Sequence, residues 1–222
     1  MRGRPRIDPG SQARSRAAFE RIVAAAQEML DGRDWETITV EDLCIEAEVS
    51  PSSFYRRFRS KDDLLDEVHE RWLAGRSAGA QMLVELVPWE TAPLRDICRL
   101  IAKAYIADRD ENAARSLSMF RMQVSYPRLG ARRMANDRNN LWLIVPPMAE
   151  RIGRGHDETA FALLVIAHSI HAAVQPPATF IDQLDMTIDD LVERLVDAFA
   201  GMLHLDLDGD VRPGRSAAPV AS

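Results

Sequence analysis

The stretch Thr39–Lys61 limits the fold more than any other part of the chain, because it has the pattern of two short helices joined by a tight turn. The turn ends at Ser50, whose hydroxyl can accept a hydrogen bond from an unpaired amide of the next helix. Pro51 follows at the first helical position, where the amide hydrogen that proline lacks is not needed. Phe54 and Phe58 stand one helical turn apart, so they share one buried face. The sequence therefore predicts a helix-turn-helix whose second helix runs from about Pro51 to Phe58.

The exposed face of this second helix carries side chains that suit DNA. At about 100° per residue, the positions opposite or beside the phenylalanines hold small hydroxyls, a phenol and arginines: Ser52, Ser53, Tyr55, Arg56, Arg57 and Arg59. From Ser50 to Lys61 there are four basic residues and no acidic one, although the formal net charge of the chain is −6. Hydroxyls can reach base edges in the major groove, and cations and phenols can reach phosphates. The pattern predicts a DNA-binding helix; the alternative is an amphipathic helix with a solvated basic face.

The block from about Arg16 to Val68 resembles the DNA-binding domain of TetR/AcrR-type transcriptional regulators. The residues that carry the resemblance occur in the family's order: Ile22 to Ala26, Trp35 to Leu43, Val49-Ser50, Ser53 to Arg56, Phe58, and Ser60 to Leu65. The resemblance implies an all-α fold, with an N-terminal three-helix DNA-binding domain that contains the helix-turn-helix and a C-terminal helical domain for ligand binding and dimerisation. Glu48 departs from the pattern, because the family usually has glycine there, so we expect strain in a turn that favours a left-handed backbone.

Candidates for DNA contact come from this second helix and from the helix starts on either side of it. On the second helix we expect Ser52, Ser53, Tyr55 and Arg56 at the DNA surface, with Pro51 and Arg57 beside them. Thr39 caps the preceding helix, with Asp42 as its capping-box partner, and the resemblance implies that the Thr39 hydroxyl meets a phosphate. Lys61 lies in the first turn of the following helix, where the helix dipole disfavours a cation. The resemblance implies that Lys61 also contacts a phosphate.

Composition and periodicity divide the chain into four parts. Residues 1–15 are rich in Arg, Gly, Pro and Ser, which predicts a flexible basic arm; such an arm can enter the minor groove or only raise nonspecific affinity. Residues 16–68 are the predicted helix-turn-helix domain, whose first helix is expected from about Arg14 to Leu30. Residues 69–205 are helical in pattern throughout and form the predicted effector-binding and dimerisation domain. Residues 206–222 lack apolar periodicity, which predicts a disordered tail.

Two C-terminal helices are predicted to form a homodimer interface. The helix 157–175 is apolar on almost every side, so it needs burial on more than one side. The helix 187–205 carries an apolar stripe: Ile188, Leu191, Val192, Leu195, Phe199, Met202 and Leu203. An exposed stripe of this size is unusual on a monomer, and two such helices from each of two chains form a four-helix interface in the TetR family. A dimer also suits a palindromic double-stranded DNA operator. The alternative is that both helices close the core of a monomer.

Soft and aromatic side chains of the C-terminal domain are candidates for an effector pocket: Met119, Phe120, Gln123, Trp142, His168 and His171. Members of the family usually hold an apolar cavity in this domain, and methionine-rich surroundings favour a small hydrophobic effector. Taken singly, each of these residues is more often plain core. His168 and His171 have the spacing of zinc ligands, but the sequence offers no third ligand, so we predict neither a metal nor a cofactor.

Sequence motifs and targeting signals indicate the general class of the protein. We expect no G-x-S-x-G elbow, phosphate loop, dinucleotide fingerprint or H-E-x-x-H motif in the chain, which argues against an enzyme. It has no signal peptide and no apolar run of membrane-spanning length, which predicts a cytoplasmic protein without membrane contact, and its preference for arginine over lysine suggests a GC-rich bacterial genome. We predict a sequence-specific DNA-binding repressor that a small hydrophobic effector releases from its operator. The alternatives are an activator of the same fold, a regulator controlled by a protein partner, and a helical carrier or enzyme with a vestigial DNA-binding head.

Overall fold

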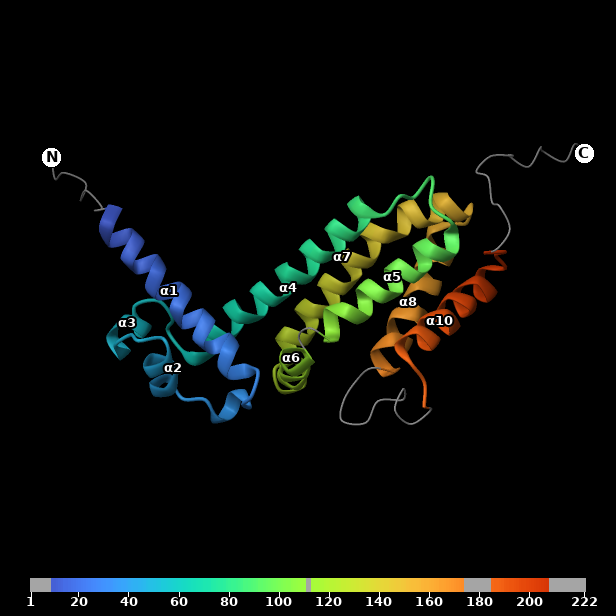
Figure 1. The fold of residues 1–222 in the computed structure, drawn as a ribbon. Coiled ribbons are helices and arrows are strands. Elements are labelled where there is room, and N and C mark those ends of the chain that lie inside the picture. Colours follow the sequence, from blue (N-terminus) through green and yellow to red (C-terminus); the bar gives the residue numbers. More distant parts are fainter. Residues whose placement is uncertain (1–8, 111–112, 174–184, 208–222) are drawn as a thin grey trace, which may run out of the picture. The chain divides into compact units, whose positions relative to one another are not determined.

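The computed structural model describes residues 9–110, 113–173 and 185–207, and in these ranges it consists of helices without strands (Figure 1). In chain order the elements are α1 (Pro9–Leu30), the 3-10 helix η1 (Trp35–Thr37), α2 (Val40–Glu46), α3 (Pro51–Tyr55), α4 (Lys61–Leu86), α5 (Leu94–Asp110), α6 (Ala113–Ser125), α7 (Pro127–Ile152), α8 (His156–Ala173) and α10 (Ile188–Leu203). The predicted all-α fold class is confirmed. Among the described residues, no helix combines the length and the apolar character that a bilayer span requires.

The chain forms two compact units, and neither is a continuous segment. Unit 1 comprises residues 1–75 and 112–133, and unit 2 comprises residues 76–111 and 134–222. The helices α4 and α7 each continue from one unit into the other. The sequence analysis placed the domain boundary at residue 68 and gave α6 to the C-terminal domain. In the structure the boundary lies further along α4, and α6 belongs to the unit that holds the helix-turn-helix.

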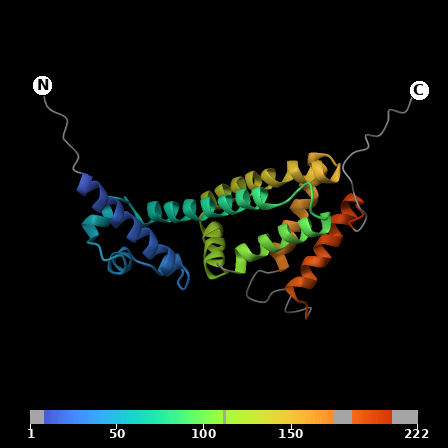
Figure 2. The same cartoon turned by 45° about the horizontal axis from the view of Figure 1, so that its top comes forward.

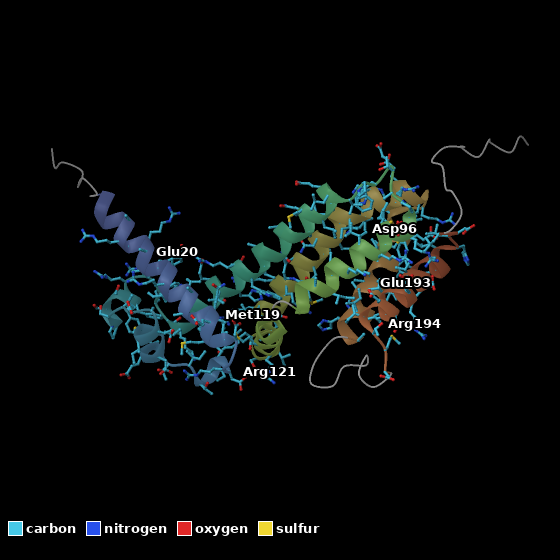
Figure 3. All side chains as sticks on the ribbon, in the orientation of Figure 1. Glu20, Asp96, Met119, Arg121, Glu193 and Arg194 are labelled. Atoms are coloured by element: carbon cyan, nitrogen blue, oxygen red, sulfur yellow. The ribbon has the colours of Figure 1, made fainter. Side chains whose placement is uncertain are left out.

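The helix α6 belongs to unit 1 because its apolar side chains complete the core of that unit. Met119 and Met122 of α6 are buried together with Leu30, Phe54 and Leu64 of the N-terminal helices (Figure 3 labels Met119). Ser118 on α6 donates its hydroxyl to the carbonyl of Leu30 at 2.7 Å, which satisfies a carbonyl at the end of α1. Periodicity identified α6 as a helix, but it could not identify which core the helix would join.

The helix α1 begins at Pro9, so part of the segment predicted to be a flexible arm is helical. Proline favours the first position of a helix, and the residues that follow it contain no other proline and little glycine to end the helix before Leu30. The predicted arm therefore keeps only residues 1–8 outside the helix, and these lie outside the described residues. Most of the predicted tail, residues 208–222, lies outside them as well.

Unit 2 is held together by the packing of α5, α8 and α10 (Figures 1 and 2). Its core is a continuous apolar cluster to which all three helices contribute, for example Ile97, Ile170 and Val192. Ion pairs line the seam between α5 and α10. Arg99 on α5 pairs with both Asp96 and Glu193, which Figure 3 labels, at 3.0 and 2.9 Å. The other pairs along this seam join Arg95 to Glu193 and Asp197, and Lys103 to Asp189.

The apolar stripe of α10 packs within its own chain. Val192, Phe199 and Leu203 are each at most 3% exposed in the core of unit 2, because α5 and α8 cover this side of the helix. The stripe thus does not supply the exposed dimer surface that the sequence analysis expected from it. Apolar surface remains open on α8 instead, where Phe161 is 66% exposed and Leu164 is 43% exposed.

Candidate nucleic-acid interface

Side-chain caps fix both helices of the helix-turn-helix, as the sequence predicted. The hydroxyl of Thr39 accepts a hydrogen bond from the amide of Asp42 at 3.0 Å, and the Asp42 carboxylate accepts one from the amide of Thr39 at 3.0 Å. Ser50 caps α3 by accepting from the amide of Ser53 at 3.2 Å, and Pro51 occupies the first position of α3. These caps satisfy amides that a helix start leaves unpaired, so local sequence alone sets where α2 and α3 begin.

The turn between α2 and α3 is strained at Glu48. Its φ is +51°, in the left-handed region that glycine adopts easily and that other L-residues adopt at a cost of about 1 kcal/mol or more. The strain that the sequence predicted for this position is confirmed. The Glu48 side chain is exposed, so the cost arises from the backbone and not from crowding.

The apolar face of α3 is anchored by an aromatic cluster. Phe54 and Phe58 are buried, with ring centroids 5.6 Å apart, and Phe19 of α1 stacks on Phe58 at 5.2 Å. The helix is shorter than predicted, since regular α-helix ends at Tyr55 and a turn carries the chain through Arg57. The aromatic cluster nevertheless sets which face of α3 remains at the surface.

That surface consists of four of the predicted residues: Pro51, Ser52, Tyr55 and Arg56. Tyr55 is 56% exposed, and its ring meets the edge of Phe54 at 5.3 Å, which limits its orientations. Ser52 shares a 3.0 Å hydroxyl contact with Ser50. Arg56 makes no ion pair with any residue that the structure describes. Together with the exposed Ser50, this face therefore offers two hydroxyls, a phenol and an available guanidinium, which are groups that can contact base edges and phosphates.

Ser53 and Arg57 are not part of this open surface. The Ser53 side chain is buried, and Arg57 donates to its carbonyl at 2.6 Å and to its hydroxyl at 2.8 Å. Arg57 also donates to the carbonyl and the hydroxyl of Ser15 in α1, at 3.1 and 3.2 Å. The Arg57 guanidinium thus ties α3 to α1, and the DNA contacts predicted for Ser53 and Arg57 stay predictions. The partner Ser15 lies 42 residues away, so no local pattern could indicate this contact.

The region around α3 is electropositive. Burial lowers the pKa of the Arg57 guanidinium from its ordinary value, and the nearby cations Arg56 and Arg21 lower it further. Arg21 is held close by a 3.0 Å hydrogen bond to the carbonyl of Ala47 at the end of α2. Arg59 is neutralised in part by Asp63, which accepts from its Nε at 2.9 Å. A patch of this sign attracts phosphate even though the whole chain is acidic.

The phosphate-contact candidates Thr39 and Lys61 differ in how they are placed. Thr39 is exposed at the start of α2, where a hydroxyl and helix amides can meet an anion. The Lys61 ammonium points instead to backbone carbonyls, those of Trp35 at 2.7 Å and Ile38 at 2.8 Å. It also lies 4.9 Å from the centroid of the Trp35 ring. The structure thus gives Lys61 partners that the resemblance did not suggest.

The predicted effector residues do not form one site within either unit. Met119 and Gln123 are buried in unit 1, whereas Trp142, His168 and His171 belong to unit 2. The side chain of Phe120 lies outside the described residues. His168 is exposed and its Nδ1 contacts the carbonyl of Leu164 at 2.8 Å, a contact within one helical turn. No group of residues suited to a metal ion occurs in the described part of the chain.

Sequence reasoning missed His69, which is fully buried on α4 in unit 1. Its Nε2 lies 3.4 Å from the amide nitrogen of Gln123 on α6, and its ring tilts against Trp72. Burial lowers the pKa of His69 to about 4, with the nearby Arg132 acting in the same direction. The signal in the sequence was a polar residue next to the apolar positions of α4, but the identity of its partner required the fold.

One enzyme-like motif was also overlooked. Gly75–Gly79 matches the G-x-S-x-G pattern of hydrolase nucleophiles. In those enzymes the serine lies at a sharp turn between a strand and a helix, whereas Ser77 lies in the middle of α4. Its hydroxyl accepts a 2.6 Å hydrogen bond from Asn136. The motif therefore has no nucleophile elbow around it.

Comparisons with known proteins agree with this geometry. Residues 22–68 match the family model described as bacterial regulatory proteins, tetR family, and this match covers the α1–α4 region that forms the interface. Residues 22–68 are therefore a DNA-binding domain of the TetR type. Among curated proteins, no sequence is significantly similar to this chain.

Solved structures resemble this chain over most of its length. A TetR-family transcriptional regulator from Streptomyces coelicolor is 17% identical, with a TM-score of 0.62 over 90% of this chain and 96% of that one. A TetR-like transcriptional regulator from Rhodococcus is 15% identical, with a TM-score of 0.55 over 84% and 96%. The fatty acid degradation regulator FadR from Bacillus halodurans is 13% identical, with a TM-score of 0.58 over 89% and 96%. At these identities the similarity establishes the fold, which this chain shares with the three regulators.

Proposed function

We propose that the protein is a cytoplasmic homodimeric repressor that binds a palindromic operator and leaves it when a small hydrophobic effector binds. The observation that carries the DNA-binding part is the exposed face of α3. Its hydroxyls, phenol and guanidinium stand on a helix fixed by a cap, a proline and an aromatic cluster. A rigid presentation of this kind lowers the entropy lost on binding.

The DNA contacts are assigned by exposure. Ser52, Tyr55 and Arg56 make the base and phosphate contacts from α3, with Pro51 beside them, and the Thr39 hydroxyl binds a phosphate at the start of α2. Ser53 and Arg57 act from beneath by holding α3 in place. An Arg side chain that reaches a guanine in the major groove contributes about 1–3 kcal/mol to discrimination, so Arg56 is the residue whose loss would most alter base preference.

The homodimer forms through α8 and α10, on the surface that unit 2 leaves open. Phe161 and Leu164 supply exposed apolar side chains on α8. The exposed residues Ala198 and Gly201 on α10 are small, which lets helices of a second copy approach closely. A two-fold arrangement of two heads then matches the symmetry of a palindromic operator.

The effector acts on DNA binding through α4. This helix starts beside the helix-turn-helix at Lys61 and ends in unit 2 at Leu86. A shift of one end of the helix would therefore also move the residues at its other end. Within unit 1, α6 meets α4 at the buried contact between Gln123 and His69. An effector that displaced α6 would therefore break the contact between α6 and α4. Among the predicted effector residues, Trp142, His168 and His171 remain candidates for contact in unit 2.

The test is release from DNA. The purified protein is loaded on DNA that it has selected and is then treated with the lipid-soluble fraction or the protein fraction of a cell extract. Release by the lipid-soluble fraction supports a hydrophobic effector. Release by the protein fraction alone supports the alternative of a protein partner. Reporter expression that falls when the gene is deleted would contradict repression and would favour an activator.

A further inference from the structure

Lys61 has a coordination that a simple phosphate contact does not need. Its side chain is only partly exposed, and its ammonium donates to the carbonyls of Trp35 and Ile38 at 2.7 and 2.8 Å. An ammonium has three hydrogens, so two of them are taken by the backbone of the segment before α2. The Trp35 ring, 4.9 Å from Nζ, adds a favourable cation–π contact. These contacts also explain why a cation is tolerated at the start of α4.

The two carbonyls lie in a segment that sets the position of α2. Trp35 and Ile38 are 2% and 1% exposed, so their side chains anchor the segment in the core of unit 1. Ile38 immediately precedes Thr39, whose hydroxyl and amide form the capping box of α2. Lys61 therefore fastens the start of α4 to the residue next to the cap. A shift of this segment would move the end of α2 that faces a phosphate.

The same segment is also held by α6 and by the residue that follows α6. Arg121 donates to the Asp34 carboxylate at 3.1 Å, and the Tyr126 hydroxyl donates to the Glu36 carboxylate at 3.0 Å. All these residues belong to unit 1. The segment 34–38 thus has contacts with Lys61, with α6 and with the residue after α6, and the Thr39 cap is the first residue beyond the segment.

We propose that Lys61 is a positioning residue for DNA binding, which orients the Thr39 end of α2 through the carbonyls of Trp35 and Ile38 and does not bind a phosphate itself. This inference rests on the proposed function, because it concerns how the head is held for DNA. It assigns Lys61 a role that differs from the phosphate contact implied by the family resemblance.

The salt dependence of DNA affinity separates the two roles. Loss of a phosphate contact lowers the slope of log K against log [salt] by about 0.9 per contact, whereas loss of a positioning contact leaves the number of phosphate contacts unchanged. The Lys61→Met variant is expected to weaken binding about tenfold, because a hydrogen bond to a charged group contributes about that factor to an equilibrium constant. Its slope is expected to equal that of the wild type. The reference is the decrease of about 0.9 expected for one lost phosphate contact, whereas Arg56→Met, which removes a base-contacting cation from α3, is expected to alter base preference.

Two further variants keep the test decisive if Lys61→Met folds poorly. Lys61→Arg preserves the charge, so a phosphate contact would survive, but a planar guanidinium cannot reproduce an ammonium held by two carbonyls beside an indole. Positioning predicts weaker binding by Lys61→Arg at an unchanged slope. The variant Thr39→Ala provides a double-mutant cycle: if Lys61 acts through the cap, Lys61→Met weakens binding much less in the Thr39→Ala background than in the wild type.

The experiments distinguish a failure of the Lys61 proposal from a failure of the proposed function. Affinities are measured on the motif that the wild type selects, or on mixed-sequence duplex DNA if it selects none, since nonspecific binding also has a salt slope. Absence of a motif counts against the proposed function alone. A slope lowered by about 0.9 in Lys61→Met, or full affinity of Lys61→Arg, overturns the positioning role. Additive effects of Lys61→Met and Thr39→Ala also overturn it.

Discussion

Replacement of Arg57 by methionine tests whether this side chain stabilises the packing of α3 against α1. Methionine keeps most of the apolar stem but cannot donate a hydrogen bond. The variant leaves the carbonyl and hydroxyl of the buried Ser53 without the donor that now lies 2.6 and 2.8 Å away. A buried hydrogen bond to a charged group contributes about 1.5–3 kcal/mol, and the exposed bonds to Ser15 add little. We therefore expect Arg57→Met to lower the free energy of unfolding by about 2 kcal/mol.

The assay is urea denaturation followed by circular dichroism, with thermal melting as a second measure. For a chain of this length, about 2 kcal/mol corresponds to a fall of about 4–8 °C in Tm. The matched control is Arg56→Met at the neighbouring position, where the guanidinium is exposed and has no ion pair among the described residues. Changes at such surface sites usually stay within about 0.5 kcal/mol. If Arg57→Met were as stable as Arg56→Met, the hydrogen bonds of Arg57 would not stabilise the fold, and its role in holding α3 against α1 would be refuted.

Three other predictions follow from particular contacts. Glu48→Gly should raise the free energy of unfolding by about 0.5–1 kcal/mol in urea denaturation, because it relieves a φ of +51°; an unchanged or lower stability would contradict the strain. His69 has a folded-state pKa of about 4, below its unfolded value, so its contribution is complete above about pH 6.5 and is lost as pH falls toward 4. His69→Leu should flatten the pH dependence of stability in that window, and an unchanged profile would contradict burial of the neutral ring. Phe161→Asp should convert the proposed dimer to monomers in analytical ultracentrifugation, whereas Met82→Asp, at an exposed site on α4, should not; a Phe161→Asp protein that stays dimeric would place the interface elsewhere.

The helix-turn-helix was predictable because its determinants are local. The Thr39–Asp42 box, the Ser50-Pro51 start and the Phe54–Phe58 pair each act within four residues, which is the range that sequence periodicity and capping rules cover. The same locality made the strained turn at Glu48 predictable, since only one position of that turn needs a left-handed backbone.

The contacts that decide the roles of individual side chains were not predictable, because they join distant parts of the chain. Arg57 meets Ser15 across 42 positions, and Lys61 meets Trp35 and Ile38 across 26 and 23. A basic residue on a predicted surface helix can equally bind a phosphate or a carbonyl of its own chain, and the sequence does not distinguish the two. Only the packed structure shows which acceptors are within reach.

The apolar stripe of α10 illustrates a related limit. Its spacing correctly predicted one buried face, but burial can come from the same chain or from a second copy. In the structure α5 and α8 cover Val192 and Phe199, so the pattern carried no information on assembly. The helix 157–175 was more informative, because its nearly all-round apolar pattern predicted more than one covered side, and in the structure α8 keeps Phe161 and Leu164 exposed.

The most direct test of the account is the DNA that the protein selects from a random duplex library. We expect the wild type to retain a motif with two-fold related half-sites, and Arg56→Ala to lose preference at the same base position in each half-site. Retention of DNA without any shared motif, by a protein whose helices are intact by circular dichroism, would contradict the claim that the exposed face of α3 recognises sequence.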